Sequence, residues 1–327
     1  SILQSKKSKY TKCKFNEMIK LIGNIDLIWI LQLIYEIFRL RGIFSNEHGV
    51  FNQVKNSCSS GYYTPKEVIT FIYSYLTEVC NFKGGDILEP SCGNGVFFKY
   101  MPKGLRANSS ITGIELDCLT SKIAQGIYSD IAIINQPLQE VDFIDRKYDL
   151  IIGNPPYSHE VVTDNFMPDI SNYTIHHYFV AKCVRLLKDE GILALVLPCY
   201  YLDVPRRNTR AIVNNEAVLI DVVRLPENLF TQATVTVDIV FIRKSGKRLH
   251  NFVNTVLLEQ DGNKDSINEY WQTKPQRILG ELKLKWVECY KRHVPTCVTS
   301  DINQVFNVLT NCRFSSETKQ NYSLIAG

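Results

Sequence analysis

The fold of this chain is decided by one stretch, Asp149-Leu150-Ile151-Ile152-Gly153-Asn154-Pro155-Pro156-Tyr157. Its apolar run, residues 150–152, predicts a buried strand that ends at a glycine and two prolines. Because proline donates no backbone hydrogen bond and biases the residue before it towards an extended form, the strand leads into a rigid turn. The turn presents the Asn154 amide, two backbone carbonyls and the Tyr157 ring. It lies at the carboxyl end of a strand, where open α/β sheets bind their ligands.

These groups suit a planar ligand that carries an amine. Carbonyl oxygens accept the N–H hydrogens and leave the nitrogen lone pair free to attack, while an aromatic ring stacks on the flat face. The string from Asn154 to Tyr157 resembles motif IV of the amino-methyltransferases, in the form used by N6-adenine DNA methyltransferases. The same string occurs in methyltransferases that act on release-factor glutamine and on ribosomal RNA amines. The plainer alternative is a strand-to-loop proline turn with a packing tyrosine.

A second motif lies upstream, at Tyr63-Thr64-Pro65. Thr64 is a favourable N-cap and Pro65 suits the first helical position, so a helix is expected from there to about residue 80. The turn resembles motif X of the same family, which covers the methionine end of S-adenosylmethionine. A motif X that precedes the cofactor strand is typical of the γ class.

The next segment predicts a short strand that ends in an acid and leads into a turn with two glycines, Glu89-Pro90-Ser91-Cys92-Gly93-Asn94-Gly95. Glycines let the backbone pass close to a ligand, and Glu89 can accept the ligand's ammonium group. The segment lacks the complete dinucleotide fingerprint, which disfavours NAD. It resembles motif I, so cofactor contacts are expected from Glu89, Ser91, Gly93 and Gly95.

Two further strands, at residues 111–115 and 131–134, carry the rest of the expected cofactor site. Glu115 ends the first and is placed to accept both ribose hydroxyls, and the resemblance puts Leu116 against the adenine ring. After the second strand the family usually has Asp-Phe, but this chain has Gln136 and Pro137. Either the Gln136 amide oxygen accepts from the cofactor's adenine amine, or the cofactor is bound loosely.

The motifs in their order imply a Rossmann-like, seven-stranded class I S-adenosylmethionine-dependent methyltransferase fold. Its sheet is expected to be mostly parallel, with helices on both faces and one antiparallel strand. Apolar runs at 191–197, 219–225 and 235–242 predict the last three strands, and 158–173 predicts a mobile loop. We divide the chain into an N-terminal helical extension (1–60), a catalytic domain (61–248) and a small C-terminal region (249–327). The last is interpreted as a reduced target-recognition or partner-binding segment.

Two groups downstream are candidate contacts with nucleic acid. In the family an aromatic residue in the loop before the last strand stacks on the flipped base opposite the motif IV tyrosine, and Phe230 matches that place. Its alternative is a core phenylalanine that anchors the loop. Arg206, Arg207 and Arg210 open a predicted helix and are candidate phosphate contacts, with a solvated helix face as the alternative.

The distribution of charge fits a nucleic-acid partner. Residues 1–60 contain nine Lys/Arg and four Asp/Glu, residues 61–239 contain fifteen and 21, and residues 240–327 contain thirteen and eight. The two ends are therefore basic and the middle is acidic, as expected if the ends contact phosphates. The alternative is that the basic ends serve only solubility.

Cysteine and histidine usage predicts no metal site. None of the ten cysteines forms a Cys-x-x-Cys pair, and no Cys/His cluster has the spacing of a zinc site. The cysteines are interpreted as small buried residues in a reducing compartment. No signal peptide or membrane span is predicted, because charged residues interrupt the most apolar run, at 25–44. The expected location is cytoplasmic.

The resemblance implies a γ-class methyltransferase that transfers a methyl group from S-adenosylmethionine to the N6 amine of adenine in DNA after base flipping. Asn154 and the carbonyl of Pro155 would hold the amine, Pro156 would stiffen the turn, and Tyr157 with Phe230 would sandwich the base. Three alternatives remain. The acceptor is another amine (N4-cytosine, ribosomal RNA or protein glutamine), the chain is a non-catalytic cofactor-binding subunit, or a separate specificity subunit selects the target.

Overall fold

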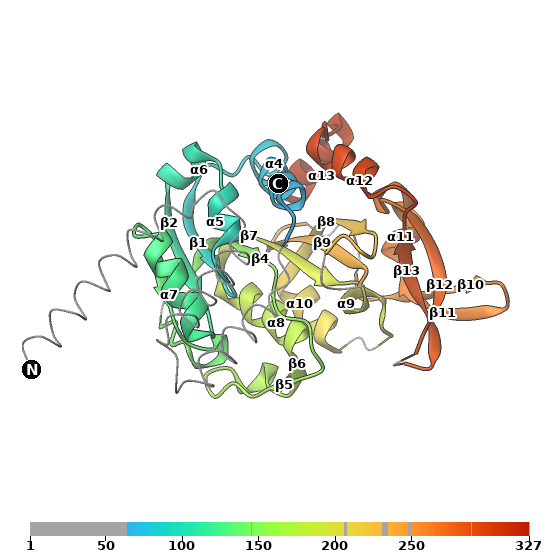
Figure 1. Ribbon diagram of the computed structural model, residues 1–327, viewed down its shortest axis with the longest axis horizontal. Coiled ribbons are helices and arrows are strands. Elements are labelled where there is room, and N and C mark those ends of the chain that lie inside the picture. Colours follow the sequence, from blue (N-terminus) through green and yellow to red (C-terminus); the bar gives the residue numbers. More distant parts are fainter. Residues whose placement is uncertain are drawn as a thin grey trace, which may run out of the picture.

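The computed structural model describes residues 64–326, with gaps at 145, 206–207, 231–234, 248–249, 251 and 289. The expected helical extension at 1–60 and the expected site residues Tyr63, Arg206 and Arg207 lie outside the described residues. A seven-stranded sheet forms the centre of the molecule, in the order β3-β2-β1-β4-β7-β9-β8 (Figure 1). Its strands are β1 (Gly85–Glu89), β2 (Ser109–Ile114), β3 (Ala132–Ile134), β4 (Tyr148–Gly153), β7 (Leu187–Pro198), β8 (Ala217–Leu225) and β9 (Val237–Lys244).

The pairing confirms the expected mostly parallel sheet. Strands β3, β2, β1, β4 and β7 run parallel to one another, and β9 runs antiparallel to both of its neighbours, β7 and β8. The central parts of β4 and β7 are continuous apolar runs, as expected where both faces of the sheet are covered. Residues 150–153 of β4 and 191–198 of β7 are accordingly all buried. The fold is the class I methyltransferase architecture that the motif order implied.

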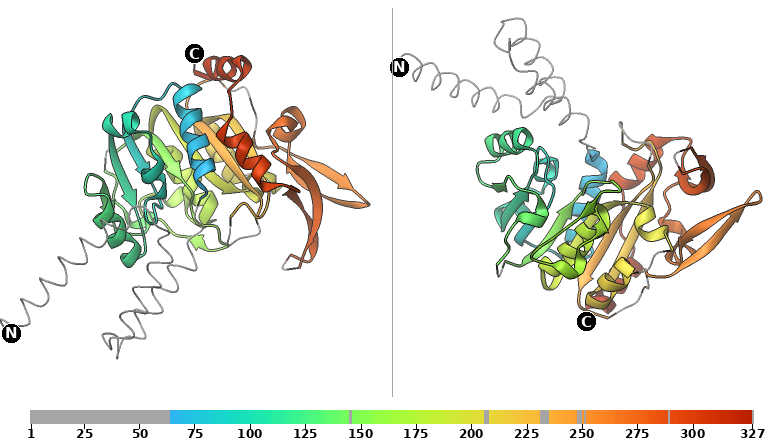
Figure 2. Two further views of the ribbon diagram at one scale, coloured as in Figure 1. Left: turned by 45° about the horizontal axis from the view of Figure 1, so that its top comes forward. Right: turned by 90° about the horizontal axis from the view of Figure 1, so that it is seen from below.

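Helices cover both faces of the sheet. On one face α4 packs beside α12, and on the other α8 packs beside α10 (Figure 2). Among the described helices, none combines the length and the apolarity needed to cross a bilayer. The helices are α4 (Lys66–Glu78), α5 (Val96–Tyr100), α6 (Lys103–Ala107), α7 (Cys118–Ile127), α8 (Ile175–Leu186), α9 (Tyr200–Asp203), α10 (Asn208–Glu216), α11 (Tyr270–Thr273), α12 (Ile302–Thr310) and α13 (Ser316–Ala326).

The segment after motif IV, expected to be a mobile loop, is fastened to α8. It contains the short strands β5 (Val161–Val162) and β6 (Tyr173–Thr174), which pair with each other. Asp164 is buried and accepts hydrogen bonds from the Tyr178 hydroxyl at 2.6 Å and the Lys182 Nζ at 2.7 Å. Burial opposes the charge of Asp164, but these two donors hold its pKa below the usual value. Buried contacts with α8 therefore hold this segment in place.

The C-terminal region forms two hairpins and two further helices. The hairpins pair β10 (Thr255–Gln260) with β11 (Asn263–Asn268), and β12 (Glu281–Val287) with β13 (Arg292–Val298). Both project from the β8 side of the sheet (Figure 2). Phe252 and Trp271 belong to one hydrophobic core, and Val305 and Leu309 to the other. The region therefore shares both cores with the catalytic domain.

A buried ion-pair group joins this region to the sheet. Arg224 of β8 lies 2.8 Å from a carboxylate oxygen of Asp238 in β9 and 2.8 Å from one of Asp203 in α9. Its guanidinium also lies over the Trp271 ring, 4.3 Å from the centroid. Because all these charges are out of water, removing one partner would leave an uncompensated buried charge. The group therefore fixes α9 and α11 against the sheet.

Candidate active site

The predicted site residues come together at the carboxyl ends of three adjacent strands. Glu89 is the last residue of β1, Glu115 directly follows β2, and Asn154 directly follows β4. Strands β2, β1 and β4 are neighbours and run parallel, so these three side chains lie along one edge of the sheet. The parallel topology thus places groups that are up to 65 residues apart in the chain at one site.

The turn after β1 depends on two glycines with left-handed backbone. Gly95 has φ +82, and a Cβ there would lie 2.3 Å from the Tyr128 ring, whose hydroxyl donates to the Gly95 carbonyl at 2.9 Å. Gly93 has φ +53, but a Cβ there would meet nothing within 4 Å. Packing against Tyr128 therefore requires a glycine at position 95. Gly93 faces open space, as expected where a backbone approaches a ligand.

Glu89 is a buried acid without compensation. Its side chain is 1% exposed, and its Oε2 atom has no hydrogen-bond partner among the described atoms. Burial, with a smaller contribution from the nearby Glu115 carboxylate, raises the pKa of Glu89 well above its usual value. A buried carboxyl of this kind is costly to the fold unless a cation pairs with it. Glu89 therefore fits a cationic group of a ligand such as an ammonium.

Glu115 and Leu116 form the next part of the site. The Glu115 carboxylate accepts from the Gly93 backbone N–H at 2.8 Å and the Asp117 backbone N–H at 2.7 Å, and it is half-buried. Burial raises its pKa, while these backbone hydrogen bonds oppose the shift. Leu116 beside it is 68% exposed, so its side chain is accessible to a flat ligand at this edge.

Gln136 and Pro137 replace the family's usual Asp-Phe after the third strand, and the adjacent Asn135 has a structural role. The Asn135 side-chain amide donates to the carbonyls of Glu115 at 2.8 Å and Leu116 at 3.0 Å, so it fixes the turn that presents both residues. Gln136 is exposed at the same edge. Asn135 stabilises the site's backbone, a role that sequence reasoning missed because both carbonyls belong to another strand end.

Motifs X, I and IV are hydrogen-bonded to one another. The Asn154 Nδ2 donates to the Thr64 hydroxyl at 3.1 Å, and the Ser91 hydroxyl donates to the Asn154 carbonyl at 3.2 Å. The prediction that Thr64 caps the helix was wrong. Helix α4 begins at Lys66 with Pro65 in the N-cap position and no side-chain cap, because Thr64 binds Asn154 instead. Motif X thus orients the amide of motif IV.

Tyr157 points its hydroxyl inwards. The hydroxyl lies between the Asn154 Oδ1, which it contacts closely, and the Val196 carbonyl of β7 at 2.9 Å. Burial is the largest cause that raises the pKa of Tyr157 well above its usual value, so the phenol stays protonated and acts as a donor. Pro155 is buried and Pro156 is exposed beside it. The turn therefore holds the Asn154 amide from both of its ends.

The position of Phe230 differs from the expectation. Its ring is 3% exposed and belongs to the same hydrophobic core as Leu229, so it presents no face to a base in this conformation. The loop-anchoring alternative fits this arrangement. The cause is local, since Phe230 follows β8 closely and an apolar ring there is covered by the strands' own core.

Arg210 is not a phosphate contact, and this prediction was wrong. Its side chain is fully buried, and its guanidinium donates to the carbonyls of Tyr201 at 3.0 Å, Val204 at 2.6 Å and Val253 at 3.0 Å. Arginine has five donors in a fixed fork, so it can satisfy several carbonyls at once. Arg210 therefore joins α10 to the chain after α9 and to the C-terminal region.

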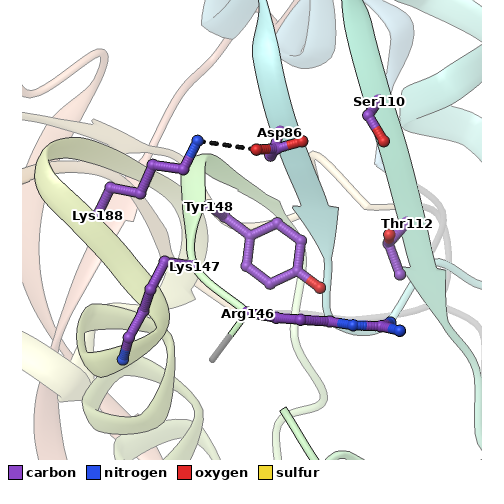
Figure 3. A pocket seen from close by; sticks show the side chains of 7 residues that line it. All are labelled: Asp86, Ser110, Thr112, Arg146, Lys147, Tyr148 and Lys188. Atoms are coloured by element: carbon purple, nitrogen blue, oxygen red, sulfur yellow. Dashed lines mark hydrogen bonds and ion pairs between the residues drawn. The ribbon is translucent and has the colours of Figure 1, made fainter. Parts of the chain in front are cut away.

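A polar cavity of about 410 Å³ lies at the opposite, amino end of the strands (Figure 3). Lys188 Nζ lies 2.8 Å from Asp86 and 2.8 Å from Asp149, so its charge is compensated within the fold. In the described part of the chain, no group of three His, Cys, Asp or Glu side chains is arranged as metal ligands. The cavity is lined by Asp86, Ser110, Thr112, Arg146, Lys147, Tyr148 and Lys188.

Comparison with known proteins agrees with this geometry. The family model described as N-6 DNA Methylase matches residues 48–309. A type II methyltransferase of Paramecium bursaria Chlorella virus XZ-6E, M.CvrRI, is 30% identical over 207 residues, which cover 60% of this chain and 52% of that protein. The methylase subunit of the type I restriction enzyme MjaIX of Methanocaldococcus jannaschii is 24% identical over 261 residues, 68% of this chain and 46% of that protein. The chain thus spans about half the length of these two relatives.

Solved structures share the fold. A modification subunit of a putative type I restriction enzyme from Vibrio vulnificus YJ016 superposes with a TM-score of 0.51 at 19% identity. The match covers 85% of this chain and 66% of that one. The methyltransferase subunit of a type I restriction-modification system from Streptococcus thermophilus has a TM-score of 0.50 at 14% identity, covering 84% and 62%. Since the family model matches most of the chain, this protein belongs to the N-6 DNA methylase family.

Proposed function

We propose that this chain transfers a methyl group from S-adenosylmethionine to the N6 amine of adenine in DNA. The observation that supports this most strongly is the fixed amide of Asn154. Its Nδ2 donates to the Thr64 hydroxyl and its Oδ1 lies against the Tyr157 hydroxyl, while the Ser91 hydroxyl holds its backbone carbonyl. The side-chain amide is therefore held in one orientation at the sheet edge. Asparagine held in this way is suited to positioning an amine, which is the main task when the methyl donor is already reactive.

The residues at the strand ends fit the proposed cofactor. When bound, S-adenosylmethionine supplies a methyl group on a positively charged sulfur, which makes the group reactive. Glu89, whose buried Oε2 has no hydrogen-bond partner in the part of the chain that the structure describes, would take its ammonium group. Glu115 would accept its ribose hydroxyls, and the exposed Leu116 would cover its adenine ring, with Gln136 at the ring's edge. The open space at Gly93 leaves room for the ligand against the turn.

The target amine would be held by carbonyl oxygens. The Asn154 Oδ1 accepts from the Tyr157 hydroxyl and retains a second lone pair, because an amide oxygen can accept twice. With the Pro155 carbonyl it would accept both amine hydrogens and leave the nitrogen lone pair free. The base must first leave the duplex at a cost of a few kcal/mol, and stacking on the Tyr157 ring would return part of it, about 1–3 kcal/mol.

DNA is the proposed substrate because of relatives and charge together. M.CvrRI is named a type II methyltransferase, the MjaIX protein is named a type I restriction enzyme methylase subunit, and the matching family is described as N-6 DNA Methylase. The stretch from residue 240 to 327 contains thirteen Lys/Arg against eight Asp/Glu, which suits contact with phosphates. Relatives of the type I class are described as subunits, so we propose that target selection involves a separate specificity subunit.

The test is transfer from labelled S-adenosylmethionine to unmodified double-stranded DNA, followed by separation of the nucleosides by mass. N6-methyladenine is the expected product, and N4-methylcytosine would instead make the chain a cytosine enzyme. Label in ribosomal RNA or protein, but not in DNA, would reject the proposal. If the chain alone binds the cofactor but transfers no methyl group, and a specificity subunit restores the transfer, the type I arrangement is supported. Cofactor binding that no partner converts into transfer would indicate a non-catalytic subunit.

A further inference from the structure

Three aromatic side chains from distant parts of the chain meet beside the motif IV turn. The His159 ring stacks near the Tyr200 ring, with centroids 6.5 Å apart and an interplanar angle of 25°. The Tyr290 ring lies edge-on to His159 at 6.2 Å. His159 follows Asn154 by five residues, Tyr200 begins α9 directly after β7, and Tyr290 lies in the turn between β12 and β13. We call these three residues the aromatic platform.

The aromatic platform is accessible and well supported. His159 is exposed and Tyr290 is 44% exposed, so both rings are accessible from solvent. Tyr200 is half-buried, because the buried His176 ring packs edge-on beneath it at 4.9 Å. The platform therefore has one supported side and one open side, and it lies at the end of the sheet that carries Asn154.

The hairpin that supplies Tyr290 is fixed at its base. The Glu227 backbone N–H donates to the Cys297 carbonyl at 2.8 Å, and the Cys297 backbone N–H donates to the Thr236 hydroxyl at 2.9 Å. Lys285 of β12 also pairs with Glu227. Since both strands of the hairpin are held to the loop between β8 and β9, its turn is presented to the motif IV segment at a set position.

The hairpin carries one cation that no described acid compensates. Of the four Lys/Arg in residues 281–298, Lys283, Lys285 and Arg292 pair with Glu281, Glu227 and Asp265. Lys291, next to Tyr290 in the turn, has no acidic partner among the described residues. Trp286 of β12 is 52% exposed and adds a further aromatic face. Exposed cations interleaved with aromatic rings are the composition that binds nucleic acid, because phosphates meet the cations and bases stack on the rings.

We propose that the aromatic platform stacks a nucleobase of the DNA strand next to the displaced adenine, and that Lys291 contacts the adjoining phosphate. This proposal rests on the function proposed above and assigns part of its DNA contact to the C-terminal region. Stacking accepts any base, since every base has an aromatic face. The platform therefore sets affinity for DNA and the ease of displacing the base, while sequence choice is made elsewhere.

The test compares DNA binding by the full chain and its variants, by anisotropy of short fluorescein-labelled single-stranded and duplex DNA, with S-adenosylhomocysteine present. Tyr290→Ala is expected to weaken binding about 10-fold and Tyr290→Phe to restore it, since stacking needs only the ring. Lys291→Ala is expected to lower the dependence of log Kd on log salt by roughly one phosphate contact. Leu257→Ala and Lys264→Ala, exposed positions on the β10–β11 hairpin, are the matched controls and are expected to bind as the wild type.

Wild-type affinity in the Tyr200→Ala/Tyr290→Ala double variant would overturn the proposed stacking, and wild-type salt dependence in Lys291→Ala would overturn the proposed phosphate contact. A wild-type chain that binds neither the single-stranded nor the duplex DNA would overturn both. If these variants bind DNA as the wild type does but fail to assemble with a specificity subunit, the proposal is also overturned, because the aromatic platform would then be a protein interface. Failure of the methylase function is separate. In that case the wild type transfers no methyl to DNA, yet the Tyr290→Ala loss of DNA affinity would still support the platform.

Discussion

The two ends of the parallel sheet treat their charged groups in opposite ways. At the amino end, Lys188 is paired with both Asp86 and Asp149 at 2.8 Å, and these side chains remain partly exposed. At the carboxyl end, Glu89 is 1% exposed and its Oε2 has no hydrogen-bond partner within residues 64–326 as described. Lys188 and its two acids compensate one another, whereas Glu89 is a buried acid that no described cation pairs with.

The difference separates structural charge from charge that awaits a ligand. A buried ionisable group without a partner reduces stability, so its presence at a strand end indicates that binding compensates for it. The amino-end cavity is also lined by polar and charged side chains, but Lys188 and Asp86 already pair with each other there (Figure 3). The functional end of this sheet is therefore identified by a buried ionisable group without an ion-pair partner among the described residues, more than by the presence of polar residues.

The largest effect is expected from Asn154→Ala. It removes the amide that would hold the target amine, so methyl transfer is expected to fall about 100- to 1,000-fold, as when a positioned donor or acceptor at a reacting group is lost. Cofactor affinity should remain measurable, because Glu89 and Glu115 are untouched. Transfer is measured with labelled S-adenosylmethionine and affinity by calorimetry. Equal loss of both would show that Asn154 supports the fold of the site and does not position the amine.

Glu89→Gln is expected to weaken S-adenosylmethionine binding about 10- to 100-fold, since a charge-assisted hydrogen bond is lost. Burial raises the pKa of Glu89, so the wild-type carboxyl is neutral below that pKa and charged above it. Wild-type binding should therefore tighten as pH rises beyond the ordinary range of a glutamate. The variant should lose this part of the dependence and keep the part due to Glu115, whose pKa is also raised.

The stability of the ligand-free protein gives a second measurement on the same variant. A carboxyl with a raised pKa in the folded state makes the fold less stable as pH rises from the unfolded pKa to the folded one. Thermal melts across that window should show this loss in the wild type and a smaller one in Glu89→Gln. Parallel melting curves would contradict the assignment of Glu89 as an uncompensated acid.

Tyr157→Phe is expected to have an intermediate effect. It removes the hydroxyl that contacts the Asn154 Oδ1 but keeps the ring, so transfer should fall about five-fold, the value of one neutral hydrogen bond. Tyr157→Ala should lose more, with weaker binding or displacement of the base, because stacking is lost as well. Fluorescence of 2-aminopurine in the DNA reports displacement. Equal transfer rates and equal 2-aminopurine fluorescence in the two variants would show that the Tyr157 ring does not stack on the base.

The smallest effect is expected from Lys188→Met at the amino end. Its ion pairs are exposed, and such pairs contribute less than about 1 kcal/mol to the free energy of unfolding. Cofactor affinity and methyl transfer should match the wild type. A large loss of either would mean that the amino-end cavity takes part in function, and the contrast between the two ends would fail.

The sequence predicted the sheet well because its signals are local. Apolar runs bounded by glycine, proline or acids identified all seven strands, and parallel topology then brought Glu89, Glu115 and Asn154 to one edge. Two hairpins were missed although signals existed. Residues 281–286 alternate polar and apolar side chains, and Asp261-Gly262, both with positive φ, is a two-residue hairpin turn between β10 and β11.

The remaining errors concern contacts between distant segments. Thr64 has the composition of an N-cap, and only the fold shows that its hydroxyl binds Asn154, 90 residues away. Arg210 sits among arginines that suggest an exposed basic face, yet its guanidinium satisfies three carbonyls, one of them 43 residues away. Burial of a charged side chain depends on partners that no local pattern contains, so these roles were not predictable.

The packing of α12 against α4 has a consequence for engineering. Helix α12, near the end of the described chain, lies against the helix that carries motif X, and Phe314 contacts the rings of Phe71 and Tyr75 at 5.7 and 5.2 Å. A chimaera joined at residue 248 would strip apolar cover from α4. Exchange of the β12–β13 hairpin alone would remove no fully buried member of either core, although Leu282 packs against one of them. The segment that can be exchanged is thus set by its packing contacts. For the β12–β13 hairpin, the junctions lie at residues 280 and 299.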